Sequence, residues 1–445
     1  MASRSAPPGR ATPAEVLSRR IESRTATLGV IGLGYVGLPL AVELAQAGFH
    51  VQGVDLDEAR VQKLSRGVSY IQDVPTGDVK ALIRSGHLAA TTDFSVLRRC
   101  DAVNICVPTP LSKMRDPDVS YIVSATEQVR KHLHRGMLVL LESTTYPGTT
   151  TELILPELQK SGMTVGRDFF LAFSPERVDP GNPTWGTRNI PKVVGGVTPT
   201  CTRLAVQLYR QRLENVVPVS SPQVAEMVKL LENTFRSVNI GLVNELALMS
   251  RRLGIDVWEV IEAAATKPFG FMPFYPGPGL GGHCIPIDPF YLSWKARASG
   301  FEARFIELAG HVNGHMPEHV VDLVAESLNQ RGRAVRGSRV LVLGVAYKSD
   351  IDDVRESPSL DIMKTLEDRG AKVEYTDPYV PTLEFFGRRL RSVQLSATTL
   401  KRFDCVVIAT AHKTIPYPLV LRHAKGIVDT RNALRGKRSK KIVRL

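Results

Sequence analysis

The sequence lacks any long apolar segment. Its 445 residues contain no run of roughly 18 or more uncharged apolar residues, the length that a membrane-spanning helix requires. The N-terminal residues 1–27 also lack the apolar centre of a secretory signal. These absences predict a cytoplasmic protein with no membrane partner. A hydrophobic content of 43% is enough for the cores of two or three domains.

Cysteine is scarce as well. The five cysteines are dispersed, with no Cys-x-x-Cys pair and no histidine cluster at zinc spacing, so neither a disulfide framework nor a metal site is expected. Four of them lie in or beside apolar segments and should serve packing. The fifth, Cys284, lies in a loop of glycines and prolines.

Acidic residues are too few to balance the basic ones, and the formal net charge is +13. Most of the excess is at the two ends, because residues 1–27 carry five arginines against two glutamates and residues 431–445 carry seven basic residues and no acid. We therefore predict basic, solvated extensions at 1–27 and 433–445, and no nucleic-acid partner. The small remaining excess suits a polyanionic small ligand.

A dinucleotide fingerprint follows the first apolar strand. Residues 28–38 run from a strand through Gly32-x-Gly34-x-x-Gly37 into a helical pattern, and residues 51–55 form a second strand that ends on Asp55. The glycines allow a tight turn, close approach of a pyrophosphate and close helix packing. Asp55 would bind a ribose diol and repel a 2′-phosphate, which favours NAD, although Arg60 nearby leaves NADP open.

Further short apolar runs at residues 101–107, 137–141, 169–173 and 192–194 are typical of parallel strands buried on both faces. Polar segments follow several of these runs. Ligands bind beyond the carboxyl ends of parallel strands, so these segments are expected to line a site unless they are ordinary turns.

A second α/β pattern begins near residue 333, with strands predicted at 338–343, 372–375, 405–409 and 426–429. Its first turn lacks the three glycines but carries Lys348 and Arg355, which could bind phosphates or could be surface charges. The predicted fold class is α/β, with two Rossmann-like parallel-sheet domains joined by a long central helix and a helical dimerisation domain.

The long helix is expected from residues 223–253, which contain no proline and a single glycine. Lys229, Asn233 and Arg236 share one stripe of it, either as a functional set or as a solvated face. After this helix, residues 277–289 hold Cys284 and Asp288 in an irregular path. Cys284 could be a structural thiol, but a thiol in a chain with a dinucleotide fingerprint also suggests a nucleophile.

Taken in order from Leu28 to Asn432, these motifs resemble the UDP-glucose/GDP-mannose dehydrogenase family, and residues 142–148, 174–182 and 274–284 look most like the bacterial UDP-N-acetylglucosamine 6-dehydrogenases. The resemblance implies an NAD-binding domain at 28–217, a central helical dimerisation and catalytic-loop domain at 218–330, and a UDP-binding domain at 331–432. It also implies a homodimer.

The resemblance further implies that the C6 alcohol of a UDP-sugar, with UDP-N-acetylglucosamine preferred, is oxidised to a carboxylate with two NAD, through a thiohemiacetal and a thioester on the cysteine. The residues matched to catalytic positions are Cys284, Lys229, Asn233, Asp288, Glu176 and Thr145. Those matched to cofactor contacts are Gly32, Gly34, Tyr35, Val36, Gly37, Asp55, Arg60, Thr109 and Thr145. Those matched to substrate contacts are Arg177, Val178, Lys229, Asn233, Arg236, Lys267, Gly281, Gly282, Lys348 and Arg355.

The sequence departs from the UDP-glucose enzymes at three points. Pro180 replaces a second acid, His283 replaces the serine before the cysteine, and no arginine occurs between Arg252 and Arg297, where only Lys267 is a nearby base. The missing arginine leaves recognition of the sugar open and fits a bulkier N-acetylated substrate, with UDP-glucose and UDP-N-acetylmannosamine as the alternatives. A two-electron β-hydroxyacid dehydrogenase would need neither the Cys284 loop nor a second nucleotide domain. A protein that binds nucleotide sugars without turnover would have no reason to keep the catalytic set.

Overall fold

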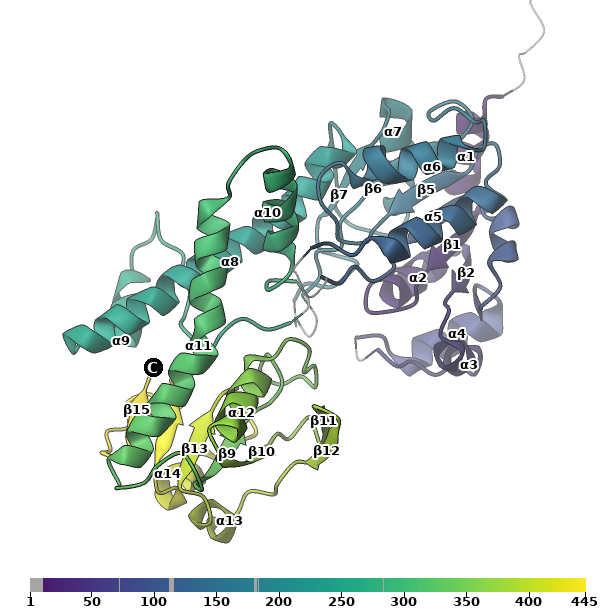
Figure 1. The fold of residues 1–445 in the computed structure, drawn as a ribbon. Helices are drawn as coiled ribbons and strands as arrows, with labels where there is room; N and C mark the ends of the chain where they lie inside the picture. The colour runs from purple at the N-terminus through teal and green to yellow at the C-terminus, as the bar shows by residue number, and fades with distance from the viewer. Residues whose placement is uncertain (1–10, 72, 112–115, 180–181, 183, 283) are drawn as a thin grey trace, which may run out of the picture. The chain divides into compact units, whose positions relative to one another are not determined.

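The computed structural model describes residues 11–445 except 72, 112–115, 180–181, 183 and 283. The chain divides into two compact units, with the boundary between Leu231 and Glu232 (Figure 1). Each unit contains a sheet of mainly parallel strands covered by helices, which confirms the predicted α/β fold class. Among the residues described, no helix is long and apolar enough to cross a membrane.

The first unit is built on an eight-stranded sheet in the order β3-β2-β1-β4-β5-β6-β7-β8, in which only the β6–β7 pair is antiparallel. This order contains the doubly wound 3-2-1-4-5-6 arrangement of dinucleotide-binding sheets. The strands are β1 (Thr27–Ile31), β2 (His50–Val54), β3 (Leu88–Thr91), β4 (Ala102–Ile105), β5 (Leu138–Leu141), β6 (Phe170–Phe173), β7 (Lys192–Gly196) and β8 (Val216–Val219).

Helices cover both faces of this sheet, because alternate residues of each strand belong to different hydrophobic cores. Leu138 and Leu140 of β5 join the core that also contains α1, α2 and α7, whereas Val139 and Leu141 join the core of α5 and α6. The helices are α1 (Pro13–Glu22), α2 (Gly37–Gln46), α3 (Glu58–Ser65), α4 (Thr76–Ser85), α5 (Ser120–His132), α6 (Leu155–Gln159) and α7 (Pro199–Tyr209), with shorter turns η1 (Phe94–Arg99) and η2 (Thr150–Ile154).

The prediction that residues 1–27 form a solvated extension is wrong for the part that is described. Thr12 and Glu15 form a capping box at the start of α1, and Leu17 and Ile21 are buried in the core that contains α2 and α7. The arginines of α1 obscure this pattern in the sequence. Two apolar side chains four residues apart are enough to fix one face of so short a helix.

The second unit begins within α8 (Pro222–Leu253), and its helical part continues with α9 (Val257–Ala264), α10 (Asp288–Ala298) and α11 (Arg304–Asn329). A parallel five-stranded sheet follows in the order β10-β9-β13-β14-β15. Its strands are β9 (Arg339–Leu343), β10 (Lys372–Thr376), β13 (Cys405–Ile408), β14 (Ile427–Asp429) and β15 (Ile442–Arg444). The helices α12 (Pro358–Asp368), α13 (Ala397–Lys401) and α14 (Tyr417–His423) and the hairpin β11 (Thr382–Phe385) with β12 (Arg388–Arg391) complete the unit.

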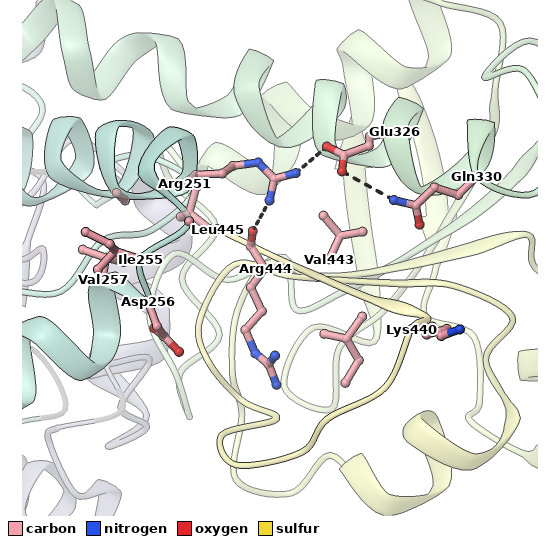
Figure 2. Close-up of a pocket in the computed structure, with 13 residues that line it drawn as sticks. Arg251, Ile255, Asp256, Val257, Glu326, Gln330, Lys440, Val443, Arg444 and Leu445 are labelled. Atoms are coloured by element: carbon pink, nitrogen blue, oxygen red, sulfur yellow. Dashed lines mark hydrogen bonds and ion pairs between the residues drawn. The ribbon is translucent and has the colours of Figure 1, made fainter.

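The four strands predicted for the second sheet correspond to β9, β10, β13 and β14, but the predicted solvated tail at 433–445 is wrong. Its last residues form β15, and Leu445 is only 5% exposed. Arg251 of α8 donates to the carbonyl of Arg444 at 3.1 Å and pairs with Glu326 of α11, while the indole of Trp258 donates to Leu445 at 3.2 Å. Figure 2 shows this end of the chain beside a small pocket lined by α8, α11 and β15.

Candidate active site

The turn from β1 into α2 has the shape that a bound pyrophosphate requires. Gly32 has a φ of +87°, and a Cβ there would lie 2.5 Å from the carbonyl oxygen of Cys106. A Cβ on Gly37 would lie 1.8 Å from the oxygen of Gly32, so these two glycines are required by the fold itself. A Cβ on Gly34 would meet no described atom within 4 Å. Gly34 therefore faces open space, where a phosphate can approach the backbone.

Asp55, at the end of β2, is fixed beside this turn. It is 8% exposed, its Oδ2 accepts the N–H of Leu33 at 2.7 Å, and its Oδ1 accepts the N–H of Asp57 at 2.9 Å. The guanidinium of Arg60 lies 3.5 Å from Asp55 and 3.4 Å from Asp57. Because the charge of Arg60 is already paired with these two carboxylates, Arg60 is less available to a 2′-phosphate. The arrangement therefore suits a ribose diol better than a 2′-phosphate. The hydroxyl of Tyr70 also holds the turn by donating to the carbonyl of Leu33 at 2.6 Å. No local sequence motif predicts this contact.

The remaining residues matched to cofactor contacts lie around the same edge. Val36 is the residue before α2, and its side chain does not cap the helix among the described residues. Tyr35 is 52% exposed and Thr109 is 3% exposed. The residues of the first unit thus fit a dinucleotide at the glycine turn.

Residues 142–150, between β5 and η2, form a buried polar loop that holds Thr145. The hydroxyls of Thr145 and Thr149 are hydrogen-bonded, and Ser143 donates to the carbonyl of Val107 at 2.8 Å. Glu226 of α8 accepts the N–H of Gly148 at 2.6 Å and the N–H of Thr150 at 2.9 Å. Glu226 therefore anchors the first turns of α8 to the loop, although nothing in the sequence pattern singled it out.

The same turns of α8 place Lys229 near this loop. Lys229 is 7% exposed, and its ammonium group donates to the hydroxyl of Thr144. Asn233, one turn further along α8, is 8% exposed, whereas Arg236 is exposed. The alternative of a solvated stripe is therefore wrong for Lys229 and Asn233.

Glu176, which follows β6, lies in a network of buried charges. Its Oε1 accepts the N–H groups of Arg177 and Val178 at 2.8 and 2.9 Å, and its Oε2 lies 3.3 Å from the ammonium of Lys192. Burial raises the pKa of Glu176, but Lys192 and the backbone N–H of Val178 more than offset this, so the pKa lies below its usual value. The side chain of Arg177 donates to the carbonyl of Pro191 at 2.7 Å.

In the second unit, the loop before α10 is shaped by close contacts at its glycines. A Cβ on Gly281 would lie 2.6 Å from the side chain of Tyr347, and a Cβ on Gly282 would lie 2.8 Å from its ring. Gly282 has a φ of +85° and donates its N–H to the carbonyl of Arg355 at 3.1 Å. The loop and the turn after β9 therefore pack together, which the sequence did not reveal.

Cys284 lies at the end of this loop and leads directly into α10. It is partly buried, whereas the other four cysteines are buried, as a packing role predicts. The carbonyl of Cys284 accepts the N–H of Asp288 at 2.8 Å, so the thiol and the carboxylate lie within one turn of chain. Asp288 is 2% exposed and accepts a 2.6 Å hydrogen bond from the side-chain amide of Asn233. Three of the predicted catalytic residues therefore come together in the second unit.

The turn after β9 contains Lys348 and Arg355, which are both half-buried. The guanidinium of Arg355 forms a bidentate pair with Asp353, with contacts between 2.6 and 3.1 Å. Lys267 is exposed, and its ammonium lies 5.1 Å from the ring centre of Phe269. His283 and Pro180, two of the departures noted in the sequence, lie outside the described residues.

Arg431 was counted in the sequence only as part of the basic charge of residues 431–445 and was not predicted to bind a ligand. In the structure it follows β14, donates to the carbonyl of Ala409 at 2.9 Å, and would clash at 2.5 Å with a Cβ on Gly277. Burial lowers the pKa of Arg431 to about 10. A buried guanidinium against the Cys284 loop is a candidate contact for a phosphate group. Only the spatial proximity reveals it, because Arg431 is far from residues 277–289 in sequence.

Models of the UDP-glucose/GDP-mannose dehydrogenase family match three segments of the chain in order. The NAD binding domain matches residues 26–213, the central domain matches residues 223–315, and the UDP binding domain matches residues 341–436. The NAD-binding domain of the family is therefore present, and the predicted cofactor, NAD, is confirmed.

Individual relatives agree with these matches. A UDP-N-acetyl-D-glucosamine 6-dehydrogenase of Pseudomonas aeruginosa is 36% identical, with 86% of this chain and 90% of the relative covered. A UDP-N-acetyl-D-mannosamine dehydrogenase of Pyrococcus horikoshii is also 36% identical, with 92% and 96% covered. The solved structure of a UDP-D-ManNAc dehydrogenase from P. horikoshii superposes with a TM-score of 0.86 at 33% identity, covering 94% of this chain and 98% of that one. The chain therefore belongs to the UDP-glucose/GDP-mannose dehydrogenase family.

Proposed function

We propose that the protein is an NAD-dependent UDP-sugar 6-dehydrogenase that oxidises the C6 hydroxyl of UDP-N-acetylglucosamine to a carboxylate. The observation that carries this proposal is the constellation of Cys284, Asp288 and Asn233 in a chain that also has the family's NAD-binding and UDP-binding domains. A four-electron oxidation that retains its aldehyde needs a nucleophile to hold the carbonyl carbon, and Cys284 supplies one.

The residues divide the work as follows in this proposal. NAD bound at the glycine turn would supply the hydride acceptor for each of the two oxidations of C6. The sulfur of Cys284 bonds to the aldehyde carbon, and Lys229 stabilises the negative charge that develops on its oxygen. Asn233 fixes Asp288 through their 2.6 Å hydrogen bond, and Asp288 and Thr145 order the water and proton path of the first oxidation.

Glu176 ends the reaction in this proposal by activating the water that hydrolyses the thioester. Its carboxylate is suited to this role because two backbone N–H groups and Lys192 hold it in place and keep it ionised. Lys348, Arg355 and Arg431, which are all partly buried, supply positive charge for the diphosphate of the substrate.

The identity of the sugar rests on the relatives. Two of them are N-acetylglucosamine enzymes by name, and the motifs at 142–148, 174–182 and 274–284 favour that sugar. UDP-N-acetylmannosamine is the second candidate, because a mannosamine dehydrogenase covers 92% of this chain and its counterpart among solved structures superposes at a TM-score of 0.86. The exposed Arg236 and Lys267 are two further proposed contacts of the substrate.

A panel of UDP-sugars tests the proposal. We expect two NADH for each UDP-N-acetylglucosamine consumed, no released aldehyde, and loss of turnover in Cys284→Ser. One NADH per sugar with released aldehyde would refute the thioester scheme. Turnover only of a β-hydroxyacid would indicate a two-electron β-hydroxyacid dehydrogenase. Tight binding of UDP-sugars with no NADH from any of them would indicate a protein that binds nucleotide sugars without turnover.

The protein also has a candidate surface for a homodimer. Phe235, Leu242, Met249 and Leu253 of α8 are 46 to 63% exposed and are spaced at seven, seven and four residues, so they share one face of the helix. A continuous apolar stripe of this kind favours association with a second copy. We expect Leu242→Asp to convert a dimer into monomers in light scattering. Val16→Asp, at a position 45% exposed on α1, is the matched control that should leave the mass unchanged.

A further inference from the structure

Lys192, the first residue of β7, is the buried centre of a polar network in the first unit. Only 2% of its side chain is exposed, and its ammonium group pairs with Glu142 after β5 and lies 3.3 Å from Glu176 after β6. The hydroxyl of Tyr209, the last residue of α7, bonds to Glu142 and to Asn104 of β4 at 3.1 Å. These groups come from five separate segments, which meet at one edge of the sheet.

The charges in this network do not cancel. One ammonium faces two carboxylates, so the buried group would carry a net negative charge if Glu142 and Glu176 were both ionised. Burial raises the pKa of Glu142 above its usual value, and the opposing attraction of Lys192 does not fully offset it. Burial also raises the pKa of the Cys106 thiol and of Tyr209 well above their usual values, so both groups stay neutral.

Glu176 differs from Glu142 in the donors that face it. Its Oε1 accepts two backbone N–H groups, its Oε2 faces Lys192, and the positive charge of Lys229 also favours its ionised form. Glu142 instead has Lys192 and the neutral hydroxyl of Tyr209. A proton that enters this network therefore goes to Glu142 before Glu176.

We propose that Lys192 is a positioning residue that orients Glu176 and keeps it ionised for the hydrolysis of the thioester, while Glu142 competes for the same ammonium group. This inference rests on the proposed function and assigns a task to a side chain that no sequence motif identified. A buried lysine between two carboxylates is costly to desolvate, and a purely structural position in β7 could be filled by an apolar residue.

The step that depends on Lys192 is a single proton abstraction. A water oxygen bonds to the thioester carbon, the C–S bond breaks, and its electron pair leaves with the sulfur of Cys284. One proton of the water passes to the Glu176 carboxylate, and the products are the carboxyl group of the sugar acid and the cysteine thiolate. Glu176 must be ionised at the start, so the rate of this step rises with pH until the carboxyl group is fully deprotonated.

The test measures the pH profile of hydrolysis separately from the two oxidations. Enzyme, NAD and UDP-N-acetylglucosamine are mixed in a single turnover, NADH is followed optically, and the sugar bound to the protein is followed by intact mass spectrometry. The midpoint of the acid limb of the hydrolysis rate reports the apparent pKa of the base. The two NADH signals report the steps that precede it.

Replacing Lys192 and replacing Glu142 should shift the midpoint in opposite directions. Lys192→Met removes the cation, so the midpoint moves up by about one pH unit or more, and the thioester accumulates at acidic pH values at which the wild-type enzyme still hydrolyses it. Glu142→Gln leaves the ammonium to Glu176 alone, so the midpoint moves down. The double variant Lys192→Met with Glu142→Gln removes one charge of each sign and should lie between the two. Lys192→Arg should restore the wild-type midpoint.

A structural role for Lys192 makes a different prediction. It would lower the melting temperature and the rates of all steps together, with the midpoint unchanged in every variant, and that result overturns the inference. If Lys192→Met does not fold, Glu142→Gln decides by the same criterion. Failure of the wild-type protein to produce NADH from any UDP-sugar would instead refute the proposed function. This outcome is distinct from failure of the inference on Lys192, which appears as an unchanged midpoint in an active enzyme.

Discussion

Gly34 and Gly37 belong to the same turn, yet alanine should have opposite effects at the two positions. A Cβ on Gly34 meets no described atom within 4 Å, whereas a Cβ on Gly37 would lie 1.8 Å from the carbonyl oxygen of Gly32. At Gly34 the fold has room for a methyl group, and the stability of the protein should change by less than about 1 kcal/mol. At Gly37 the backbone must move, which should cost about 3 kcal/mol or more.

The affinity for NAD should instead fall at Gly34, the position where alanine has little effect on stability. The methyl group of Gly34→Ala occupies the space through which a phosphate reaches the backbone N–H groups of α2. The loss of one hydrogen bond to a charged group is worth about 1.5–3 kcal/mol, which corresponds to roughly a 10- to 150-fold weaker Kd for NAD. Thermal unfolding and calorimetric titration with NAD measure the two effects independently.

The pair of variants separates the two uses of glycine in the turn. We expect the Gly34→Ala protein to keep the wild-type Tm and to bind NAD more weakly. The Gly37→Ala protein should have a lower Tm. An unchanged Kd for NAD in Gly34→Ala would falsify the claim that the open space above Gly34 is where the pyrophosphate lies. An unchanged Tm in Gly37→Ala would show that the turn can relax by more than the structure suggests.

Three further predictions follow from individual contacts. Leu17→Ala should destabilise the protein by about 2–5 kcal/mol in chemical denaturation, whereas the exposed Val16→Ala should change its stability by less than about 0.5 kcal/mol; equal effects would mean that α1 does not belong to the core. Asp55→Asn should narrow the preference for NAD over NADP in binding titrations, because it removes the charge that repels a 2′-phosphate; an unchanged ratio would contradict the role of Asp55. Deletion of residues 442–445 should lower the Tm by removing β15 and the partner of Trp258, a result that a solvated tail would not give.

Much of the fold could be predicted from the sequence, because its strongest signals are local. The glycine turn, the strands buried on both faces and the long α8 are each encoded in a short stretch of chain, and all of them are present. The two ends were misjudged for a related reason. Arginines and lysines dominate their composition, whereas their burial depends on two or three apolar side chains such as Leu17 and Leu445.

The polar part of the site was less accessible to prediction. The positions matched by family resemblance place Asn233, Cys284 and Asp288 together, as the structure does. The groups that hold Glu176 and the loop of Thr145 in the first unit were missed, because their contacts span large distances in sequence: Lys192 pairs with Glu142 across 50 residues, and Glu226 accepts the N–H of Thr150 from 76 residues away. A single sequence carries no periodic signal for such pairs, so they emerge only after the strands are assembled.

The two sheets show how one backbone plan is used for two ligands. Counted from the last residue of the first strand, Gly32 corresponds to Gly344, and both have a positive φ that brings the chain close to the segment after the neighbouring strand. The next strand ends in an aspartate in each case: Asp55 accepts the N–H of Leu33, and Asp377 accepts the N–H of Val345 at 2.8 Å.

The difference lies in the space and charge around these aspartates. Ala346 replaces Gly34 and is fully buried, so the second turn leaves no open approach to its backbone. His412 donates to the Oδ2 of Asp377 at 2.9 Å. Burial raises the pKa of Asp377, but His412 and the backbone N–H groups of Ala346 and Val345 together more than offset this. Among the described residues, the Asp377 carboxylate accepts five hydrogen bonds and that of Asp55 accepts three, so Asp377 has less capacity left for a ribose diol. The second sheet therefore keeps the frame of a dinucleotide site with a filled turn, and the proposed function assigns its ligand to the cations of the loops, Lys348, Arg355 and Arg431.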